Sequence, residues 1–156
     1  MIALDIPSQN PVSIEYLICD YNGTIAKDGH LLHGVKERFE VLSKSLQIIV
    51  ITADTFGSVQ QALAGLSTEV VILKSTNHTQ EKKEFLLELG ADQCVAIGNG
   101  NNDALMLQEA AISIAILGHE GCANKALNAS QIVSSSICEA LDLLIYPKRL
   151  IATLRM

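Results

Sequence analysis

Apolar residues along the chain follow two patterns, short continuous runs and runs that recur every three or four residues. Short apolar runs are typical of strands that are buried on both faces of a sheet. Between these runs, apolar residues recur at helical spacing, for example Val35, Phe39, Leu42 and Leu46. Strands that alternate with helices predict an α/β protein with a doubly wound, Rossmann-like parallel sheet and right-handed crossovers.

The pattern also places each element along the chain. The expected strands are residues 14–20, 47–52, 69–74, 93–98, 112–117 and 131–134. The expected helices are residues 35–46, 56–66, 80–90, 102–110, 122–128 and 137–145. Residues 24–32 predict a β-hairpin flap, because Asp28-Gly29 suits a type I′ turn. Neither a linker nor a repeat interrupts the pattern, so we expect one domain over residues 1–156.

The two ends of the chain carry separate expectations. Residues 1–13 predict an N-terminal edge strand that closes at Pro7 and Pro11. Residues 146–156 form an apolar tail with three basic residues. We expect this tail to be a helix that packs on the domain or on a neighbouring subunit.

Composition and charge narrow the range of partners. A chain of 156 residues is long enough to bury a core without disulfides. The net charge of −6 supplies no basic stripe for a nucleic acid. The sequence has no signal-like leader and no apolar run of about 18 residues, so we expect a cytoplasmic protein without membrane contact. Its four cysteines form no C-x-x-C pair, which predicts reduced thiols.

Polar residues stand where several expected strands end. In a doubly wound sheet, chemistry gathers just past the carboxyl ends of the strands. Lys82 adds a cation from the first turn of a helix that Thr79 could cap. The polar residues expected to converge with it are Asp20, Asn22, Thr52, Asn99 and Asp103.

A site of this composition suits a phosphate group and a magnesium ion. Free backbone N–H groups in two glycine-rich turns, "DYNGT" and "GNGNND", can point at an anion. The expected phosphate-binding residues are Gly23, Thr52, Ala53 and Lys82. Mg²⁺ takes oxygen ligands from one or two carboxylates plus a carbonyl. Its expected ligands are Asp20, the backbone carbonyl of Asn22, and Asn99 or Asp103.

These motifs resemble, in their order and spacing, those of the haloacid dehalogenase (HAD) superfamily of phosphotransferases. "DYNGT" stands where that superfamily has its nucleophile loop, and Lys82 fits its lysine position. "ITAD" and "GNGNNDALML" are similar to segments of P-type ATPases. With "PKRLIATLR" near the C-terminus, the whole string resembles small soluble P-type-ATPase-like HAD proteins.

The resemblance implies a role for each residue of the site. Asp20 would attack a phosphoryl group and become an aspartyl phosphate, while Thr52 would hold a phosphoryl oxygen. Lys82 would neutralise charge on both the nucleophile and the phosphate. Asn99 would bind Mg²⁺ directly and Asp103 through water. The substrate would be a phosphorylated small molecule or an acyl phosphate.

The sequence departs from the superfamily pattern at two positions. Most phosphatases of the superfamily carry an acid two residues after the nucleophile, where this chain has Asn22. An amide cannot carry the proton, so hydrolysis should be slow unless the leaving group is good. Asn99 replaces a metal-binding aspartate of the P-type pumps, which predicts weaker Mg²⁺ binding.

Each motif alone also has a simpler structural interpretation. Asp20 before Asn-Gly could be a turn or a helix cap, and Asp103 could be a helix N-terminal charge. Thr52 could be a satisfied hydroxyl, and Lys82 beside Lys83 could lie on a solvated helix face. The histidines lack metal-ligand spacing, although two of them, His30 and His33, lie in the hairpin that could overhang the site. The joint occurrence of the motifs favours the site.

Two functions are consistent with the sequence. One is a slow Mg²⁺-dependent phosphatase or phosphotransferase that acts through Asp20. The other is a non-catalytic module that binds a phosphorylated ligand or a protein in the same pocket. The intervals on either side of Thr52 are too short for a cap domain, so the site should be open. An open site makes a homo-oligomer plausible, with the hairpin and the tail as contacts.

Overall fold

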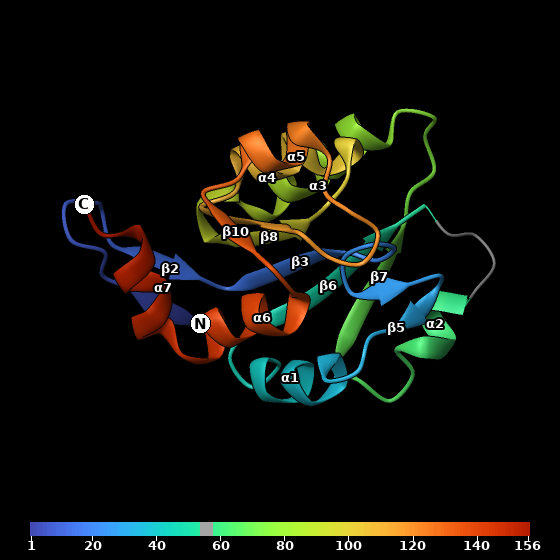
Figure 1. Ribbon diagram of the computed structural model, residues 1–156, viewed down its shortest axis with the longest axis horizontal. Helices are drawn as coiled ribbons and strands as arrows, with labels where there is room; N and C mark the ends of the chain where they lie inside the picture. Colours follow the sequence, from blue (N-terminus) through green and yellow to red (C-terminus); the bar gives the residue numbers. More distant parts are fainter. Residues whose placement is uncertain (54–57) are drawn as a thin grey trace.

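The protein is an α/β structure built around one six-stranded parallel sheet (Figure 1). The computed structural model describes residues 1–53 and 58–156. The strands, in spatial order, are β10 (Ile132–Ser134), β9 (Ile112–Ile116), β8 (Cys94–Gly98), β3 (Tyr16–Asp20), β6 (Gln47–Thr52) and β7 (Thr68–Ile72). All neighbouring pairs are parallel. This arrangement confirms the predicted doubly wound, Rossmann-like sheet.

Helices cover both faces of the sheet because its central strands are apolar on both sides. They are α1 (Val35–Leu42), α2 (Ser58–Ala62), α3 (His78–Leu89), α4 (Ala104–Glu109), α5 (Asn124–Ala129), α6 (Ile137–Ile145) and α7 (Pro147–Leu154). In β3, Leu17 and Cys19 join the core under α1 and α6, whereas Ile18 joins the core under α3, α4 and α5. Two short 3₁₀ turns, Ala91–Gln93 and Asn101–Asp103, flank β8.

A small hairpin follows the central strand. Its strands β4 (Ala26–Lys27) and β5 (His30–Leu31) are antiparallel, and Asp28 and Gly29 between them have φ of 50° and 79°. Both values suit the predicted type I′ turn. The Tyr21 hydroxyl donates to the Gly29 carbonyl oxygen at 2.9 Å, so this turn is tied to the residue after Asp20. The described residues contain this flap and no cap domain, as expected.

The predicted N-terminal strand is present, but it does not lie at the edge of the main sheet. β1 (Ile2–Leu4) pairs with β2 (Val12–Ile14) in an antiparallel ribbon separate from the main sheet. A partner within the same short segment closes a smaller loop than the sheet edge would. The strand expected at 14–20 is therefore divided, because Ile14 belongs to the ribbon and β3 begins at Tyr16.

The start of α3 also differs from the expectation. Asn77 caps this helix, with its side-chain oxygen accepting from the Gln80 N–H at 3.2 Å, whereas Thr79 lies inside the first turn. Asn is among the strongest N-cap residues. The helix expected at 56–66 is observed only as α2, and its first two predicted residues lie outside the described part of the chain.

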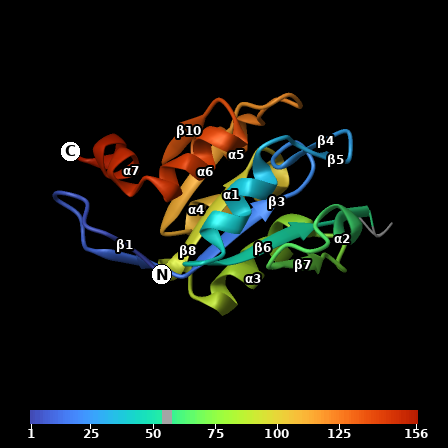
Figure 2. The ribbon, with the colours of Figure 1, turned by 90° about the horizontal axis from the view of Figure 1, so that it is seen from below.

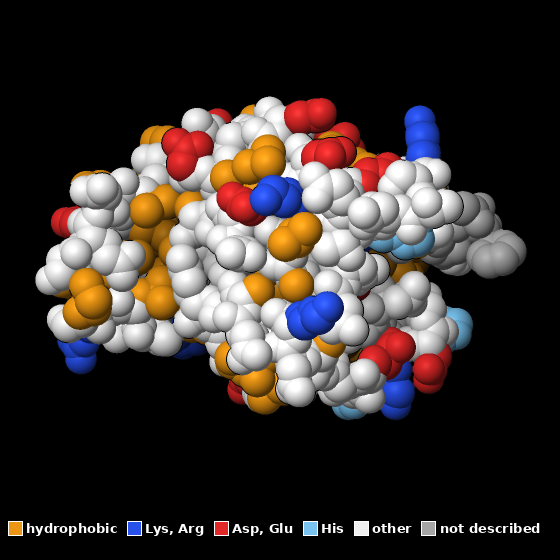
Figure 3. Space-filling view, turned by 90° about the horizontal axis from the view of Figure 1, so that it is seen from above, with side chains coloured by type: hydrophobic (Ala, Val, Ile, Leu, Met, Phe, Trp, Pro, Cys, Tyr) orange, Lys and Arg blue, Asp and Glu red, His pale blue; other side chains and the backbone are white. Residues whose placement is uncertain are grey.

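The C-terminal tail is a helix that packs on the domain. Leu150 in α7 is fully buried, and the Gln9 side-chain amide donates to the Leu154 carbonyl at 3.1 Å. The ribbon and α7 lie side by side at one end of the molecule (Figure 2). Apolar side chains gather on the surface at this end (Figure 3). The carboxyl ends of β3 and β6 point toward the opposite end.

Two further observations concern the chain as a whole. Within the described residues, none of the helices combines the length and apolar character that crossing a bilayer requires. All four cysteines are free thiols. Burial raises the pKa of Cys19 and of Cys94, which keeps both protonated.

Candidate active site

The order of the strands brings the expected site residues to one edge of the sheet. β3 lies between β8 and β6, with Asp20 opposite Ile51 and Cys19 opposite Ile97. Asp20 therefore ends its strand beside the end of β6, which carries Thr52, and beside the loop that follows β8. Thr52 is buried and Ala53 is exposed. Asp54, the last residue of "ITAD", lies outside the described residues.

A buried ion triad forms the centre of this edge. The Lys82 ammonium group lies 2.6 Å from Asp20 Oδ1 and 2.6 Å from Asp103 Oδ1. Its side chain is only 1% exposed, so the solvated helix face is excluded for this lysine. Lys83, its neighbour, instead pairs with Glu109 near the surface. When both carboxyl groups are ionised, the triad has a net negative charge.

Burial and this excess of carboxylates set the protonation of the triad. Burial, followed by the charge of Asp103, raises the pKa of Asp20 to about 7, although Lys82 opposes the shift. Burial pulls the pKa of Lys82 down, but the two carboxylates outweigh it and the net pKa is raised. The lysine is therefore charged at neutral pH, whereas Asp20 is poised between its two forms.

Asp103 also organises the loop after β8. Its second oxygen accepts from the Asn99 N–H at 3.0 Å and from the Gly100 N–H at 2.8 Å. A Cβ atom at Gly98 would lie 2.5 Å from the Asp103 carboxyl carbon, so only glycine fits there. Both oxygens of Asp103 are thus engaged, which agrees better with a water-mediated contact to a metal than with direct coordination.

Thr24 connects the two motifs and was not among the predicted site residues. Its hydroxyl lies 3.3 Å from Asp20 Oδ2 and 3.2 Å from Asn99 Oδ1. A Cβ atom at Gly23 would lie 2.4 Å from Asn99 Nδ2, and this glycine has φ +80°. Glycine at this position is therefore needed twice, for its left-handed backbone and for the approach of Asn99. The loop that follows Asp20 and the loop after β8 pack directly on each other.

The donors at this edge suit a hard divalent cation. Asp20 offers a carboxylate, Asn99 an amide oxygen and Asn22 its backbone carbonyl, all oxygen ligands of the kind that Mg²⁺ takes. The Asn22 side chain itself is exposed. The described residues contain no cluster of three or more His, Cys, Asp or Glu side chains that could hold a metal. A cation here would thus have few anionic ligands and would retain several waters.

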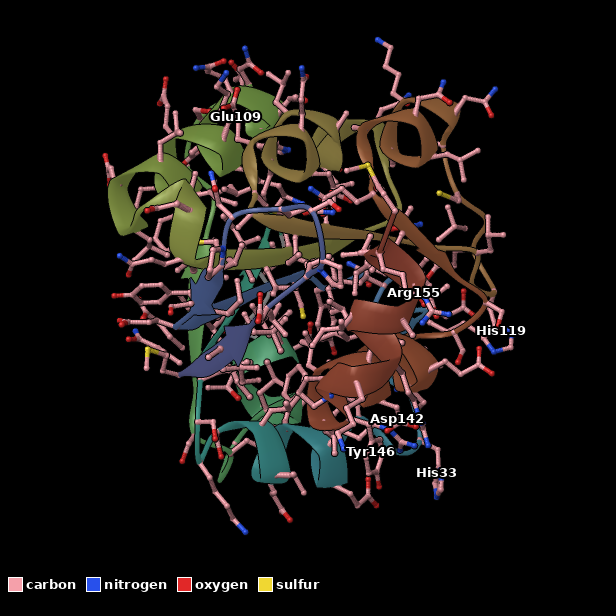
Figure 4. All side chains as sticks on the ribbon, turned by 90° about the vertical axis from the view of Figure 1, so that its left-hand side faces the viewer. His33, Glu109, His119, Asp142, Tyr146 and Arg155 are labelled. Carbon is pink, nitrogen blue, oxygen red and sulfur yellow. The ribbon has the colours of Figure 1, made fainter. Side chains whose placement is uncertain are left out.

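The remaining predictions for this region have mixed outcomes. His30, in β5, and His33 are both exposed. Figure 4 shows His33 at the molecular surface. The structure brings together Asp20, Lys82, Asn99 and Asp103 through measured contacts. Thr52 reaches the same edge through the register of β6.

A parallel sheet in this order, with an acid closing its central strand and a small hairpin directly after it, defines a HAD-type fold. The cobalt-bound deoxy-D-mannose-octulosonate 8-phosphate phosphatase (YrbI) from Haemophilus influenzae has this fold. It matches with a TM-score of 0.72, at 15% identity, over 92% of this chain and 94% of that chain. The predicted resemblance to the HAD superfamily is thereby confirmed in the fold.

Two further solved structures have the same fold. The 3-deoxy-D-manno-octulosonate 8-phosphate phosphatase from Moraxella catarrhalis, in complex with magnesium, phosphate and KDO, matches with a TM-score of 0.69. Its identity is 17%, over 91% of this chain and 94% of that chain. A protein described as a HAD superfamily (subfamily III A) hydrolase, from Legionella pneumophila, matches with a TM-score of 0.72 at 15% identity, over 90% of this chain and 87% of that chain.

Sequence relatives are found in Methanocaldococcus jannaschii. The uncharacterized protein MJ0073 is 49% identical over 61 residues, which are 39% of this chain and 66% of that protein. This share is just under two thirds of the length of MJ0073. The uncharacterized protein MJ0072 is 46% identical over 39 residues, which are 25% of this chain and 89% of that protein. No family model matches the sequence.

Proposed function

We propose that the chain is a Mg²⁺-dependent phosphatase or phosphotransferase whose nucleophile is Asp20. The observation that carries the proposal is the buried triad, in which Lys82 holds Asp20 and Asp103 at 2.6 Å each. A cation fixed beside a strand-terminal carboxylate is suited to the charge of a phosphoryl group in transfer. The phosphatases that share the fold support this assignment.

The proposed reaction has two steps. Asp20 attacks the phosphorus atom, so that an oxygen–phosphorus bond forms as the bond to the leaving group breaks. Water then attacks the aspartyl phosphate and releases inorganic phosphate and the free carboxylate. Lys82 and Thr24 orient the Asp20 carboxylate through contacts at 2.6 and 3.3 Å. Thr52 and the backbone at Ala53 would hold the phosphoryl oxygens. The expected role of Gly23 is not supported, because its N–H donates to the Ala26 carbonyl at 2.8 Å.

A divalent cation would be held by Asp20, the Asn22 carbonyl and Asn99, with Asp103 acting through water. When bound, it supplies positive charge that offsets the negative charge of the phosphoryl group. Asn99 contributes no charge of its own, so we expect weak binding of Mg²⁺. With Asp20 ionised, the triad carries one excess negative charge, which favours the cation.

Asn22 limits the substrates that the site can process. It stands at the position from which a general acid would protonate the leaving oxygen, and an amide has no acidic proton to give. General acid–base assistance is worth about 10²–10⁴-fold in rate. We therefore expect phosphorylated small molecules with good leaving groups, acyl phosphates in particular, to be the best substrates.

The test is phosphate release from acetyl phosphate and p-nitrophenyl phosphate, with Mg²⁺ and with EDTA. We expect Mg²⁺-dependent release in the wild type and none in Asp20→Asn. The matched control is Asp28→Asn, the same change in the exposed hairpin turn, which should keep the wild-type rate. Unchanged release in Asp20→Asn would refute the proposal.

Asn22→Asp tests the role of the missing acid. This variant should raise turnover of alkyl phosphates, whose leaving groups are poor, by at least about tenfold. Turnover of acetyl phosphate should change less, because acetate leaves without help from an acid. Equal gains on both substrates would contradict the role assigned to position 22.

The second candidate is a module that binds a phosphorylated ligand or a protein without turnover. The neutral side chains of Asn22 and Asn99 favour it, since both stand where the superfamily pattern has acids. In that case inorganic phosphate should raise the melting temperature while no donor is consumed. We also propose that the protein is cytoplasmic and that neither a nucleic acid nor a membrane is its partner. We further propose that it forms a homo-oligomer, and light scattering of the purified chain measures the mass of that assembly.

A further inference from the structure

A cavity of about 200 Å³ opens beside the candidate nucleophile. Buried Thr24, Ile116 and Ile137 line its floor, and exposed Leu117, His119 and Ser135 line its rim. Three separate parts of the chain therefore form it, namely the nucleophile loop, the loop after β9 and the turn between β10 and α6. Nothing in the proposed phosphoryl transfer uses this space.

The floor of the cavity reaches the candidate active site through one side chain. The Thr24 hydroxyl lies 3.3 Å from Asp20 Oδ2. The loop after β9 also approaches closely, because a Cβ atom at Gly118 would lie 3.4 Å from the Gly23 carbonyl oxygen. In Figure 1 this orange loop lies against the blue loop that follows β3. A group bound in the cavity would therefore contact Thr24, which itself contacts Asp20.

The lining of the cavity indicates the chemistry of its ligand. Leu32 from the hairpin joins the apolar floor, whereas the rim carries the His119 imidazole and the Ser135 hydroxyl. Figure 4 shows His119 on the molecular surface, at the end of the loop after β9. An apolar floor below a polar rim fits a short carbon chain that ends in a hydroxyl group.

Charge argues against an acidic ligand at this position. Among the described residues that line the cavity there is neither lysine nor arginine. The Ser135 hydroxyl donates to the Glu139 carboxylate, which places a negative charge at the rim. A ligand with its own carboxylate would be repelled there and would find no cation to pair with.

We propose that this cavity binds the organic part of the substrate's leaving group, and that this part is a short, uncharged carbon chain. The inference rests on the proposed phosphotransfer at Asp20. A volume of about 200 Å³ equals the share of about six or seven water molecules at ~30 Å³ each, so about six non-hydrogen atoms fit. Acyl phosphates with an uncharged chain of up to about six carbons are therefore the substrate class, because Asn22 favours a good leaving group.

The test is calorimetric titration of ω-hydroxyalkylphosphonates in the presence of Mg²⁺. These probes keep the phosphorus but contain no bond that the site can cleave. Each methylene that enters the cavity should tighten binding by about threefold to fourfold, because burial of one CH₂ is worth about 0.8 kcal/mol. The gain should stop at about six carbons, when the cavity is full.

Ser135→Trp fills the rim and is the matching variant. In this variant the gain in affinity for each added methylene should be at least about threefold smaller than in the wild type. Val133→Trp is the control, since this exposed residue of β10 does not line the cavity. The inference is overturned if the affinity does not change with the chain length of the phosphonate. It is also overturned if Ser135→Trp has the same gain in affinity per methylene as the wild type.

Failure of the inference is separable from failure of the proposed function. The phosphonate series measures binding alone, whereas acetyl phosphate turnover measures chemistry with a leaving group too small to need the cavity. Turnover of acetyl phosphate with a flat series refutes the leaving-group site and keeps the enzyme. If acetyl phosphate is not turned over and phosphonate affinity does not depend on chain length, the enzyme and the leaving-group site are both refuted.

Discussion

Lys82 is the residue on which both buried carboxylates of the site depend. Its replacement by methionine leaves Asp20 and Asp103 close together without a cation. Removal of one partner from a buried ion pair costs about 3–5 kcal/mol. We expect Lys82→Met to lower the free energy of unfolding by that amount, measured by urea denaturation at pH 8, which is above the pKa of Asp20.

The control for this variant is its neighbour. Lys83 pairs with Glu109 in a partly exposed ion pair, with side chains 27% and 35% exposed. Such pairs contribute less than about 1 kcal/mol, so Lys83→Met should leave stability nearly unchanged. If both variants lose the same free energy of unfolding, the buried triad contributes no more to stability than the surface ion pair does.

Asp20 gives the site a pH dependence of its own. Its pKa in the folded chain is about 7, against 3.8 as the ordinary value. The folded chain therefore binds this proton more tightly than the unfolded chain does. The contribution of Asp20 to the free energy of unfolding is fully present below pH ~4 and is lost as the pH rises through about 7.

Carboxyl-carbon NMR of the metal-free protein measures this pKa directly. We expect the Asp20 resonance to titrate with a midpoint near 7, and Mg²⁺ to move the midpoint downward because a cation favours the carboxylate. A midpoint near 4 for Asp20 without metal would contradict the proposed effect of burial.

Individual contacts in the site differ in how far the sequence determines them. Asp20, Lys82 and Asp103 could be predicted because each has a chemically distinct side chain at a strand end or in a helix start. Thr24 could not, since its partner Asn99 is 75 residues away and a hydroxyl in a turn usually bonds locally. The extreme burial of Lys82 could not be predicted either, because its neighbour Lys83 has the same side chain and is partly exposed.

Among the elements, α3 carries Lys82 and therefore its start matters. Asn77→Ala removes the side-chain acceptor of the Gln80 N–H and should cost about 1 kcal/mol of unfolding free energy. Thr79→Ala, the control, should cost less because Thr79 lies inside the helix. Urea denaturation of the two variants measures the difference. A larger loss in Thr79→Ala would place the cap where the sequence first suggested it.

Elements with strong periodicity were predictable, and those set by pairing were not. β6 and α6 begin and end at the predicted residues, since a continuous apolar run and a helical repeat define them. The ribbon of β1 and β2 was missed because edge strands and short hairpins share one apolar pattern. Arg38 and Asp142, which bridge α1 and α6 at 2.8 Å, are likewise invisible in sequence at a separation of 104 residues.

At the scale of the whole molecule, one end carries the candidate active site and the other contributes to stability. The candidate active site occupies the carboxyl edge of the sheet, whereas the ribbon and α7 close the opposite end. Leu150→Ala deletes a fully buried side chain of α7 and should lower the free energy of unfolding by about 2–5 kcal/mol.

Leu150→Ala should leave acetyl phosphate turnover per folded molecule unaltered, because α7 has no contact with the triad among the described residues. Val41→Ala, on the exposed side of α1, is the matched control for stability. Chemical denaturation and the phosphate-release assay provide the two measurements. A proportionate loss of turnover at temperatures where the variant is fully folded would mean that the two ends are coupled.

The position of Lys82 between two acids also decides how the protein responds to chemical labelling. Acylating reagents attack an amine only in its neutral form and only where they can reach it. Lys82 is 1% exposed and its pKa is raised, so it meets neither condition at neutral pH. Lys36 and Lys27, which are exposed, carry no such protection. A dye or a surface tether can therefore be attached through lysines while the ammonium group of the candidate active site stays unmodified.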